Sequence, residues 1–271
     1  MRPKVSVVIR AKDEAAAIGR TLRLLGEQEG FADAEVIVVD SGSSDRTREI
    51  AQEHGARLIE IAPESFSFGG ALNAGSREAG SDVLVALSAH AYPPDSTWLA
   101  RLVAGFDNPW VACACGQSHG PNGDPLIAPF LQDHDVARRY PGWGYSNAAG
   151  AFRAELWRQH QWREDMPGAE DKEWALHWLE RGYVALIAPA LCVDHDHSHD
   201  PLRDQYQRAR REWEGIAMIV NDLPAYSSGD LLAEWWSERG SYRSRARALL
   251  SHRRAARLLG AYSGRRRARR G

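Results

Sequence analysis

The sequence lacks long apolar runs and has few cysteines. No apolar run reaches the roughly 18 residues that a membrane-spanning helix requires. The first residues, MRPKVSVVIRAKDE, also lack the apolar stretch of a secretory signal peptide. We interpret the three cysteines, Cys113, Cys115 and Cys192, as core thiols rather than redox or metal residues. These absences lead us to expect a cytoplasmic globular protein of 271 residues.

Glycine-rich phosphate loops are missing as well. The segment after the first expected strand reads RAKDEAAAIG, which has no GxGxxG to bring backbone close to a pyrophosphate. No GxxxxGK[ST] loop occurs either. These absences argue against a dinucleotide-binding or P-loop protein. Any phosphate ligand must then be held by side chains or by a metal ion.

Acidic residues are absent from the last part of the chain. Residues 241–271 contain eleven arginines and no acid, whereas residues 1–240 carry 36 acidic residues against the remaining 23 basic ones. We expect residues 223–271 to form a basic tail, helical or partly disordered. Leucines interspersed with the arginines suit contact with an anionic membrane surface, and a solubilising tail is the alternative. Arginines without a recognised module are weak evidence for nucleic acid binding, which we do not expect.

Strand and helix patterns alternate through the first part of the chain. Apolar runs at 5–9, 34–40, 57–61 and 82–87 predict strands, and the segment 13–28 has helical periodicity behind an acidic first turn. This alternation predicts an α/β fold with a parallel sheet. Ligands of such sheets bind at the carboxyl ends of the strands. We therefore expect Arg10, Asp40 and the stretch from Ser88 to His90 to converge there.

Several motifs, in order, resemble the family 2 glycosyltransferases of GT-A fold. They are VSVVIRAKDEAAAIGRTL, EVIVVDSGSSDRT, FSFGGALNAG and AEDKEWALHWLERGY. Further stretches, LSAHAYPPDSTWL and SNAAGAFRAELW, are similar to the bacterial rhamnosyltransferase-like branch. The resemblance covers about residues 4–220.

This resemblance implies a GT-A (Rossmann-like), mostly parallel sheet flanked by helices over residues 1–222, with a C-terminal helical, basic extension. Residues 1–115 would be the nucleotide-binding half and 116–222 the acceptor half. It also implies inverting transfer of a sugar from a nucleotide-diphosphate donor to a hydroxyl of a glycan or lipid-linked saccharide. We expect a role in cell-envelope polysaccharide synthesis, with membrane contact through the 241–271 tail.

Four residues are candidates for nucleotide binding. By resemblance Asp40 contacts the nucleoside, and the alternative is a turn or N-cap aspartate. Arg10 stands where the family usually has proline, and it could face the diphosphate or pair with an acid. Asn73 borders the nucleotide in the family's pattern, although Gly70 replaces an arginine often seen there. Ser88 ends the fourth strand and is the remaining candidate.

A histidine stands where the family carries its metal-binding carboxylate. The family's Asp-x-Asp at the end of the fourth strand reads Ser88-Ala89-His90 here. Imidazole suits Mn²⁺ better than Mg²⁺, which prefers oxygen ligands. In CVDHDHSHD, His195 and His197 would share one face of an extended segment and add to the site. The alternative is a protonated His90 that stabilises the diphosphate without metal.

The catalytic prediction rests on PGAEDKEWALHWLERGY, whose periodicity predicts a helix ending before Gly182. Acidic residues at a helix N-terminus are favoured by the helix dipole, which is the structural alternative. An inverting transferase needs a carboxylate to take the acceptor proton. By resemblance Asp171 is this base and Glu170 orients the acceptor or its neighbours.

The acceptor side is expected in the loop PGWGYSNAAG and in a helix over 201–220. Trp143 or Tyr145 could stack on a sugar ring, or pack in the core, and Asn147 is a second acceptor candidate. Two rival classes remain. A nucleotidyltransferase would carry a glycine-rich signature with lysine after the first strand, which is absent. A noncatalytic sugar-nucleotide-binding or scaffold protein would explain the lost Asp-x-Asp, but it would not need Asp171.

Overall fold

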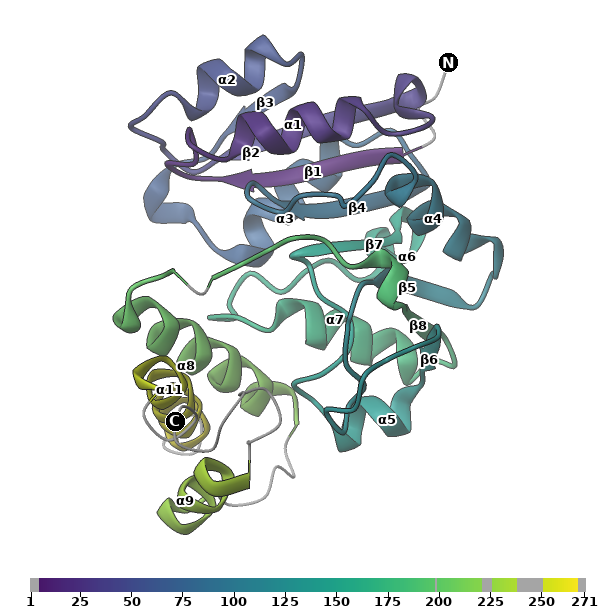
Figure 1. The fold of residues 1–271 in the computed structure, drawn as a ribbon. Helices are drawn as coiled ribbons and strands as arrows, with labels where there is room; N and C mark the ends of the chain where they lie inside the picture. Colours follow the sequence, from purple (N-terminus) through teal and green to yellow (C-terminus); the bar gives the residue numbers. More distant parts are fainter. Residues whose placement is uncertain (1–4, 198, 221–225, 238–250, 268–271) are drawn as a thin grey trace. The chain divides into compact units, whose positions relative to one another are not determined.

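The computed structural model describes residues 5–197, 199–220, 226–237 and 251–267 (Figure 1). The described chain divides into two compact units, the first comprising residues 1–165 and 170–195, the second residues 166–169 and 196–271. The predicted domain boundary at 222–223 lies outside the described residues.

The first unit is an α/β layer structure around one mixed sheet. Its strands are β1 (Val5–Ala11), β2 (Ala34–Asp40), β3 (Arg57–Glu60), β4 (Val83–Ser88), β5 (Val111–Cys115), β6 (Phe130–Gln132), β7 (Ala149–Arg153) and β8 (Val184–Ile187). Its α-helices are α1 (Ile18–Gly26), α2 (Thr47–Glu53), α3 (Phe68–Glu78), α4 (Trp98–Ala104), α5 (His134–Arg139), α6 (Ala154–Gln159) and α7 (Glu170–Leu179).

The sheet has the order β3-β2-β1-β4-β7-β5-β8-β6. Strands β3, β2, β1 and β4 are mutually parallel, as are β5 and β8, while β7 and β6 run antiparallel to their neighbours. The prediction of a mostly parallel sheet flanked by helices is confirmed. Register places Ala11 beside Asp40 and Arg10 beside Ser88, so the expected convergence of these strand ends is also confirmed.

Both faces of the sheet are covered, because successive side chains of a strand point to opposite sides. Val7 and Ile9 of β1 pack with α1, α2 and α4 in one apolar cluster. Val8 packs on the other face with α3, α6 and α7. Cys113 and Cys115 are fully buried in this second cluster and form no disulfide, which confirms their interpretation as core thiols.

The first helix begins later than its sequence pattern predicts. Residues 13–28 were expected to be helical, but α1 starts at Ile18 and Asp13 has a φ of 54°. The backbone N–H groups of Asp13, Glu14 and Ala15 are bonded to side chains of the loop after β2 instead. The acidic residues that we expected in a first helical turn therefore form a loop at the end of β1.

The second unit is helical and contains the C-terminal extension. It comprises α8 (Leu202–Ile219), α9 (Ser228–Ser237) and α11 (His252–Arg267). Its apolar core is formed by Met166, Ala169, Ile216 and Val220, with Trp213 against them. The predicted helix over 201–220 and the predicted helical extension are confirmed, whereas Leu249, Leu250 and the arginines before 251 lie outside the described residues. No helix in the described ranges has the length and apolar character needed to cross a bilayer.

Gly75 of helix α3 packs closely against β1 and β2. A Cβ at this position would stand 2.3 Å from Val8 Cγ1 and 3.1 Å from Val39 Cγ2. Both neighbours are buried and β-branched, so they have little room to move. We expect Gly75→Ala to lower the free energy of unfolding by about 1–3 kcal/mol through overpacking.

Gly26→Ala is the matched control, because no atom lies within 4 Å of a Cβ at this other helical glycine. It should leave stability unchanged or raise it by less than about 1 kcal/mol, as helix propensity predicts. Urea unfolding of both variants makes the comparison. Equal effects of the two substitutions would contradict the packing argument.

Candidate active site

Asp40 ends β2 and is fully buried. Its Oδ1 accepts hydrogen bonds from the backbone N–H of Gly42 at 3.0 Å and of Ser43 at 2.9 Å, and its Oδ2 accepts one from the Ser43 hydroxyl. These contacts are those of a turn aspartate. Asp40 thus shapes the loop at the end of β2, and a nucleoside contact stays a prediction.

Asn73 of α3 is 1% exposed and uses its whole amide group inside the first unit. Its Nδ2 donates to Trp162 O and to Glu164, while its Oδ1 accepts from the Trp157 indole and from Trp162 N–H. The amide therefore fixes the segment that follows α6. Contact between Asn73 and a nucleotide stays a prediction.

Arg10, the residue that replaces the family's proline, pairs with an acid. Its Nη1 lies 3.2 Å from Glu170 Oε1 and 3.3 Å from the carbonyl oxygen of Phe68. The side chains of Arg10 and Glu170 are 18% and 8% exposed. Of the two alternatives for Arg10, the pairing with an acid is the one found in the structure.

The first turn of α7 carries the carboxylate pair. Asn147, which precedes β7, donates from its side-chain amide to Glu170 Oε1 at 3.4 Å and from its backbone N–H to Asp171 Oδ2 at 3.2 Å. Lys172 Nζ lies 4.0 Å from Asp171 Oδ2 and also donates to the carbonyl oxygen of Tyr145. The structure therefore brings the predicted residues Arg10, Asn147, Glu170 and Asp171 together.

The two carboxylates differ in their surroundings. Burial raises the pKa of Glu170, the negative charge of Asp171 raises it further, and Arg10 opposes both. The Asp171 side chain is 15% exposed, about twice the exposure of Glu170. Asp171 is thus the carboxylate of the pair that a substrate reaches more readily.

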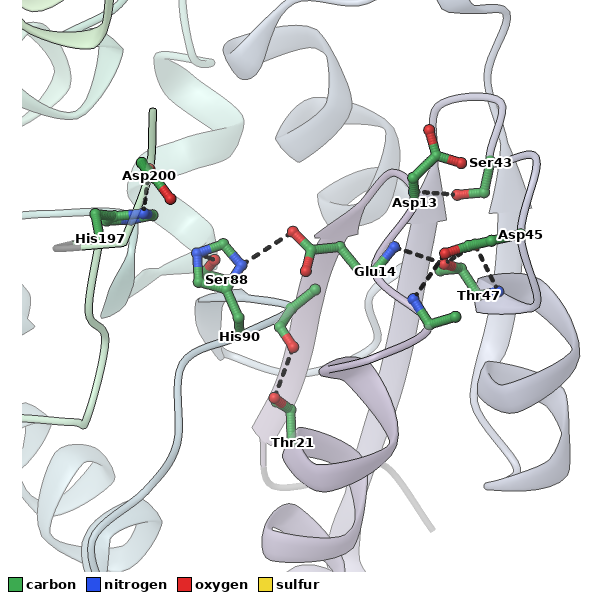
Figure 2. Close-up of polar contacts among 12 residues, drawn as sticks. Asp13, Glu14, Thr21, Ser43, Asp45, Thr47, Ser88, His90, His197 and Asp200 are labelled. Atoms are coloured by element: carbon green, nitrogen blue, oxygen red, sulfur yellow. Dashed lines mark hydrogen bonds and ion pairs between the residues drawn. The ribbon is translucent and has the colours of Figure 1, made fainter. Parts of the chain in front are cut away.

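His90, two residues past Ser88, is held by a carboxylate that the sequence pattern did not identify. Its Nδ1 lies 2.9 Å from Glu14 Oε1, and its Nε2 lies 3.4 Å from the Ser88 hydroxyl (Figure 2). Glu14 was interpreted as part of a first helical turn. Its position directly after β1, in Lys-Asp-Glu, was the available signal.

Glu14 is positioned by the loop that follows β2. Glu14 N–H donates to Thr47 Oγ1 at 2.7 Å, and the neighbouring Ala15 N–H donates to Asp45 Oδ2 at 3.0 Å. Asp13 N–H donates to the Ser43 hydroxyl at 2.9 Å (Figure 2). The loops after β1 and β2 therefore form one hydrogen-bonded clamp, and Glu14 projects from it toward His90.

His195 lies beside His90. The two imidazoles stack with ring centroids 4.8 Å apart and an interplanar angle of 18°. Paired backbone hydrogen bonds between Tyr92 and Asp194 bring the two segments together. Ligand nitrogens of His90 and His195 lie within 4.8 Å of each other, so the pair can offer two donors to one divalent cation.

His197 belongs to the second unit. There its Nδ1 lies 3.0 Å from Asp200 Oδ2 and 2.9 Å from an Arg208 nitrogen. Its predicted role as a third metal ligand stays a prediction.

The aromatic residues of the acceptor loop are packed. Tyr145 is 1% exposed and lies in the core with Trp162 and Trp174, so the packing alternative holds for this residue. Trp143 is half-buried, lies edge-on to Phe130 at 5.5 Å and donates its indole N–H to His119 O. Acceptor binding by Trp143 and Asn147 stays a prediction.

The Arg10–Glu170 pair predicts a pH-dependent stability. In Arg10→Met, Glu170 keeps its burial but loses its cation, so its ionised form destabilises the fold. The loss should approach about 2–4 kcal/mol at pH 8, somewhat below the range for a fully buried pair because Arg10 is 18% exposed. It should shrink as the pH falls below the raised folded-state pKa of Glu170 toward the ordinary value of 4.5, because the protonated carboxyl in the folded variant needs no cation.

Chemical denaturation at pH 5 and pH 8 measures the effect of this variant. The double variant Arg10→Met/Glu170→Gln should recover most of the loss at pH 8, since a neutral amide needs no cation. A double variant as unstable as Arg10→Met would show that the ion pair is not the cause.

Two curated relatives are O-antigen chain rhamnosyltransferases. RfbN of Salmonella typhimurium is 24% identical over 221 residues, which cover 76% of this chain and 70% of the relative. WbaN of Salmonella anatum is 25% identical over 190 residues, which cover 65% of this chain and 60% of the relative. The match to WbaN thus spans less than two thirds of that protein.

Among solved structures, the mannosyltransferase PcManGT from Pyrobaculum calidifontis, in complex with GDP-Man and Mn²⁺, matches with a TM-score of 0.68. The identity is 22%, and the match covers 97% of this chain and 85% of the other. This likeness confirms the GT-A fold. The model of the family described as glycosyl transferase family 2 matches residues 6–182. The chain therefore belongs to glycosyl transferase family 2, and it is similar to O-antigen rhamnosyltransferases.

Proposed function

We propose that this glycosyltransferase moves a sugar from a nucleotide-diphosphate donor to an acceptor hydroxyl with inversion, and that Asp171 is the general base. The observation that carries the proposal is the asymmetric carboxylate pair at the start of α7. Glu170 is engaged by Arg10 and Asn147, whereas Asp171 is the more exposed carboxylate. Asp171 is also oriented, by the backbone N–H groups of Asn147 and Lys172, but its greater exposure leaves it within reach of a substrate.

In the proposed reaction, Asp171 accepts the proton of the acceptor hydroxyl. The freed oxygen attacks the anomeric carbon in line with the departing diphosphate, which inverts the configuration. Glu170 does not take this proton in our proposal, because it is more buried than Asp171 and is paired with Arg10. Its role is to hold the first turn of α7 in place and thereby to orient Asp171.

The residues at the end of β4 suit a divalent cation, and PcManGT was solved with Mn²⁺. A metal-bound histidine commonly donates its other ring N–H to a carboxylate, which fixes the ring and its tautomer. Glu14 stands at His90 Nδ1 in this way, so Nε2, which lies beside the Ser88 hydroxyl, is the nitrogen that would bind the metal. His90 and His195 would hold Mn²⁺ in preference to Mg²⁺. When bound, the cation would neutralise the diphosphate leaving group.

For donor binding we propose direct contact at Ser88 and supporting roles for the other candidates. Asp40 holds the loop after β2, Asn73 holds the segment after α6, and Arg10 holds Glu170. Ser88 is half-buried beside His90, where a diphosphate bound to the metal would lie. Substitution of a supporting residue would then change donor affinity indirectly, because the segment that the residue holds would shift.

For the acceptor we propose a saccharide of the cell-envelope type. The support is the pair of curated relatives whose names specify O-antigen chain rhamnosyl transfer. A deoxyhexosyl donor and a growing, lipid-linked glycan are consistent with these names. Trp143 and Asn147 remain the proposed acceptor contacts.

Asp171→Asn tests the base assignment. The amide keeps the shape of the side chain but cannot take a proton, so transfer should fall by about 10²–10⁴-fold. Donor binding, measured by calorimetry with UDP, dTDP and GDP sugars, should change by less than about threefold, because the base contacts the acceptor.

Glu180→Gln, an exposed carboxylate directly after α7, is the control and should retain transfer. Loss of donor affinity together with activity in Asp171→Asn would mark Asp171 as a structural residue. Full activity of Asp171→Asn would reject Asp171 as the base. It would also remove the support that the carboxylate pair gives to the proposal.

His90→Ala and Glu14→Gln test the metal proposal. His90→Ala should abolish Mn²⁺-dependent donor binding because a ligand is lost. Glu14→Gln should weaken Mn²⁺ binding by about 10–100-fold because it alters the group that orients the ligand. Manganese titration followed by electron paramagnetic resonance, with and without a sugar nucleotide, measures both effects.

The matched control is His54→Ala, because His54 is an exposed histidine whose Nδ1 contacts only its own helix in Ile50 O. Donor binding that needs no metal but weakens in His90→Ala would assign His90 to the diphosphate instead.

A further inference from the structure

Helix α9 of the second unit exposes an apolar stripe. Leu232 is 59% exposed and Trp236 47% exposed. They are four residues apart and so lie on the same side of the helix, where Gly229 and Ala233 are exposed as well. Exposed apolar residues that adjoin one another mark interaction sites, whereas scattered single ones are ordinary surface.

Helix α9 is anchored to α11 through Glu234 and Trp235. The Arg254 guanidinium, 1% exposed, donates to the carbonyl oxygens of Glu234 at 3.0 Å and Trp235 at 2.6 Å. It also lies 5.1 Å from the centroid of the Trp235 ring. This anchoring holds α9 on α11 while Leu232 and Trp236 stay exposed.

Helix α11 divides its arginines between two sides. Arg254 and Arg265 are used in packing, since the Arg265 guanidinium lies 3.4 Å from the Trp213 ring centroid. Other basic residues of the helix are exposed, namely His252, Arg253, Arg257 and Arg266.

The packed side of α11 meets α8 at close range through glycines. A Cβ at Gly260 would stand 2.3 Å from Tyr206 O, and one at Gly264 would stand 2.3 Å from Arg210 O. The exposed arginines therefore sit on a rigid helix pair that does not need them for its packing.

We propose that α9 and α11 form a docking surface for an anionic lipid bilayer. Leu232 and Trp236 enter the interfacial layer, where tryptophan is favoured, and the exposed arginines of α11 pair with acidic headgroups. The surface would hold the enzyme where a lipid-linked acceptor lies, and to this extent the inference rests on the proposed function. The binding itself can be measured without any transfer reaction.

Charge decides between a bilayer and the other occupants. Helix α11 exposes Arg253, Arg257 and Arg266, so a second copy of the chain would bring like charge to the same surface. The exposed acid of α9, Asp230, caps its own helix by accepting from Ser227 N–H and Oγ. A nucleic acid backbone is charged and offers no apolar surface for the Leu232 side chain. An apolar stripe with a basic neighbour suits an acidic membrane best.

Vesicle sedimentation of the full chain tests the proposal. Vesicles of phosphatidylcholine with phosphatidylglycerol should bind the protein, and vesicles of phosphatidylcholine alone should bind it at least about tenfold more weakly. Leu232→Ser/Trp236→Ser should reduce binding to the acidic vesicles by about tenfold or more, because the apolar contribution is lost. Arg253→Gln/Arg257→Gln should reduce it by about fivefold per arginine and lessen its salt dependence.

Trp110→Ser/Ile127→Ser is the control, since these side chains are 61% and 92% exposed in the first unit. It should bind vesicles like the parent protein. Circular dichroism melting of all variants checks that they fold, and the arginine variant gives an independent measurement if the stripe variant does not.

Three results would overturn the inference. They are equal binding to acidic and neutral vesicles, unchanged binding of both the stripe and the arginine variants, and a dimer in solution that the stripe variant dissociates. Transfer to a soluble saccharide fragment separates this inference from the proposed function, because the stripe variant should retain it. A protein that binds acidic vesicles but never transfers would refute the function and leave the docking surface standing.

Discussion

Parallel pairing of β1 with both β2 and β4 is the constraint on which the site depends. This pairing aligns the carboxyl ends of three strands at one edge of the sheet, with Ala11 beside Asp40 and Arg10 beside Ser88. Because the strands are parallel, each must leave this edge through a loop, and the loops after β1 and β2 are close enough to bond to one another. A shift of register by one residue would turn Arg10 from one face of the sheet to the other.

The same edge of the sheet also stabilises a buried charge, the carboxylate of Glu170. Glu170 is nearly inaccessible, and an isolated carboxylate there would be costly to ionise. Arg10 reaches it from β1 and Asn147 from the segment before β7, so two separate parts of the chain stabilise one side chain of α7. The proline that the family usually has at position 10 could not do this. In this chain the position supports the carboxylate pair through a side chain, and the neighbouring Asp171 is left accessible.

The strands and most helices could be predicted because their signals are local. Apolar runs such as VSVVI and DVLVAL report burial on both faces, and Gly182 marks the end of α7 as expected. The start of α1 was predicted wrongly, because its first expected turn exchanges helical bonds for bonds to Ser43, Asp45 and Thr47, which are about thirty residues away. The partner of His90 was missed for the same reason, since the separation of 76 residues between Glu14 and His90 carries no periodic signal.

The roles of Asp40 and Asn73 show the opposite limit of sequence reasoning. Their positions at the edge of the site were predicted, but the structure shows their polar atoms engaged within the fold. A motif reports that a residue type is needed at a position, and it does not report whether the residue serves a ligand or the backbone. The hydrogen-bond partners seen in the structure are needed to distinguish a ligand-binding role from a role in holding the backbone.

The clamp between the loops after β1 and β2 also bears on how a ligand is bound. Loops that become ordered only around a ligand lose conformational entropy at that moment, and the loss subtracts from affinity. Here residues 13–15 are already fixed by Ser43, Asp45 and Thr47. The conformational entropy of residues 13–15 is therefore lost on folding and not on ligand binding. A donor would then bind to a preorganised edge of the sheet. Less of its binding free energy would be lost in ordering these loops, and more would remain to discriminate between sugars and bases.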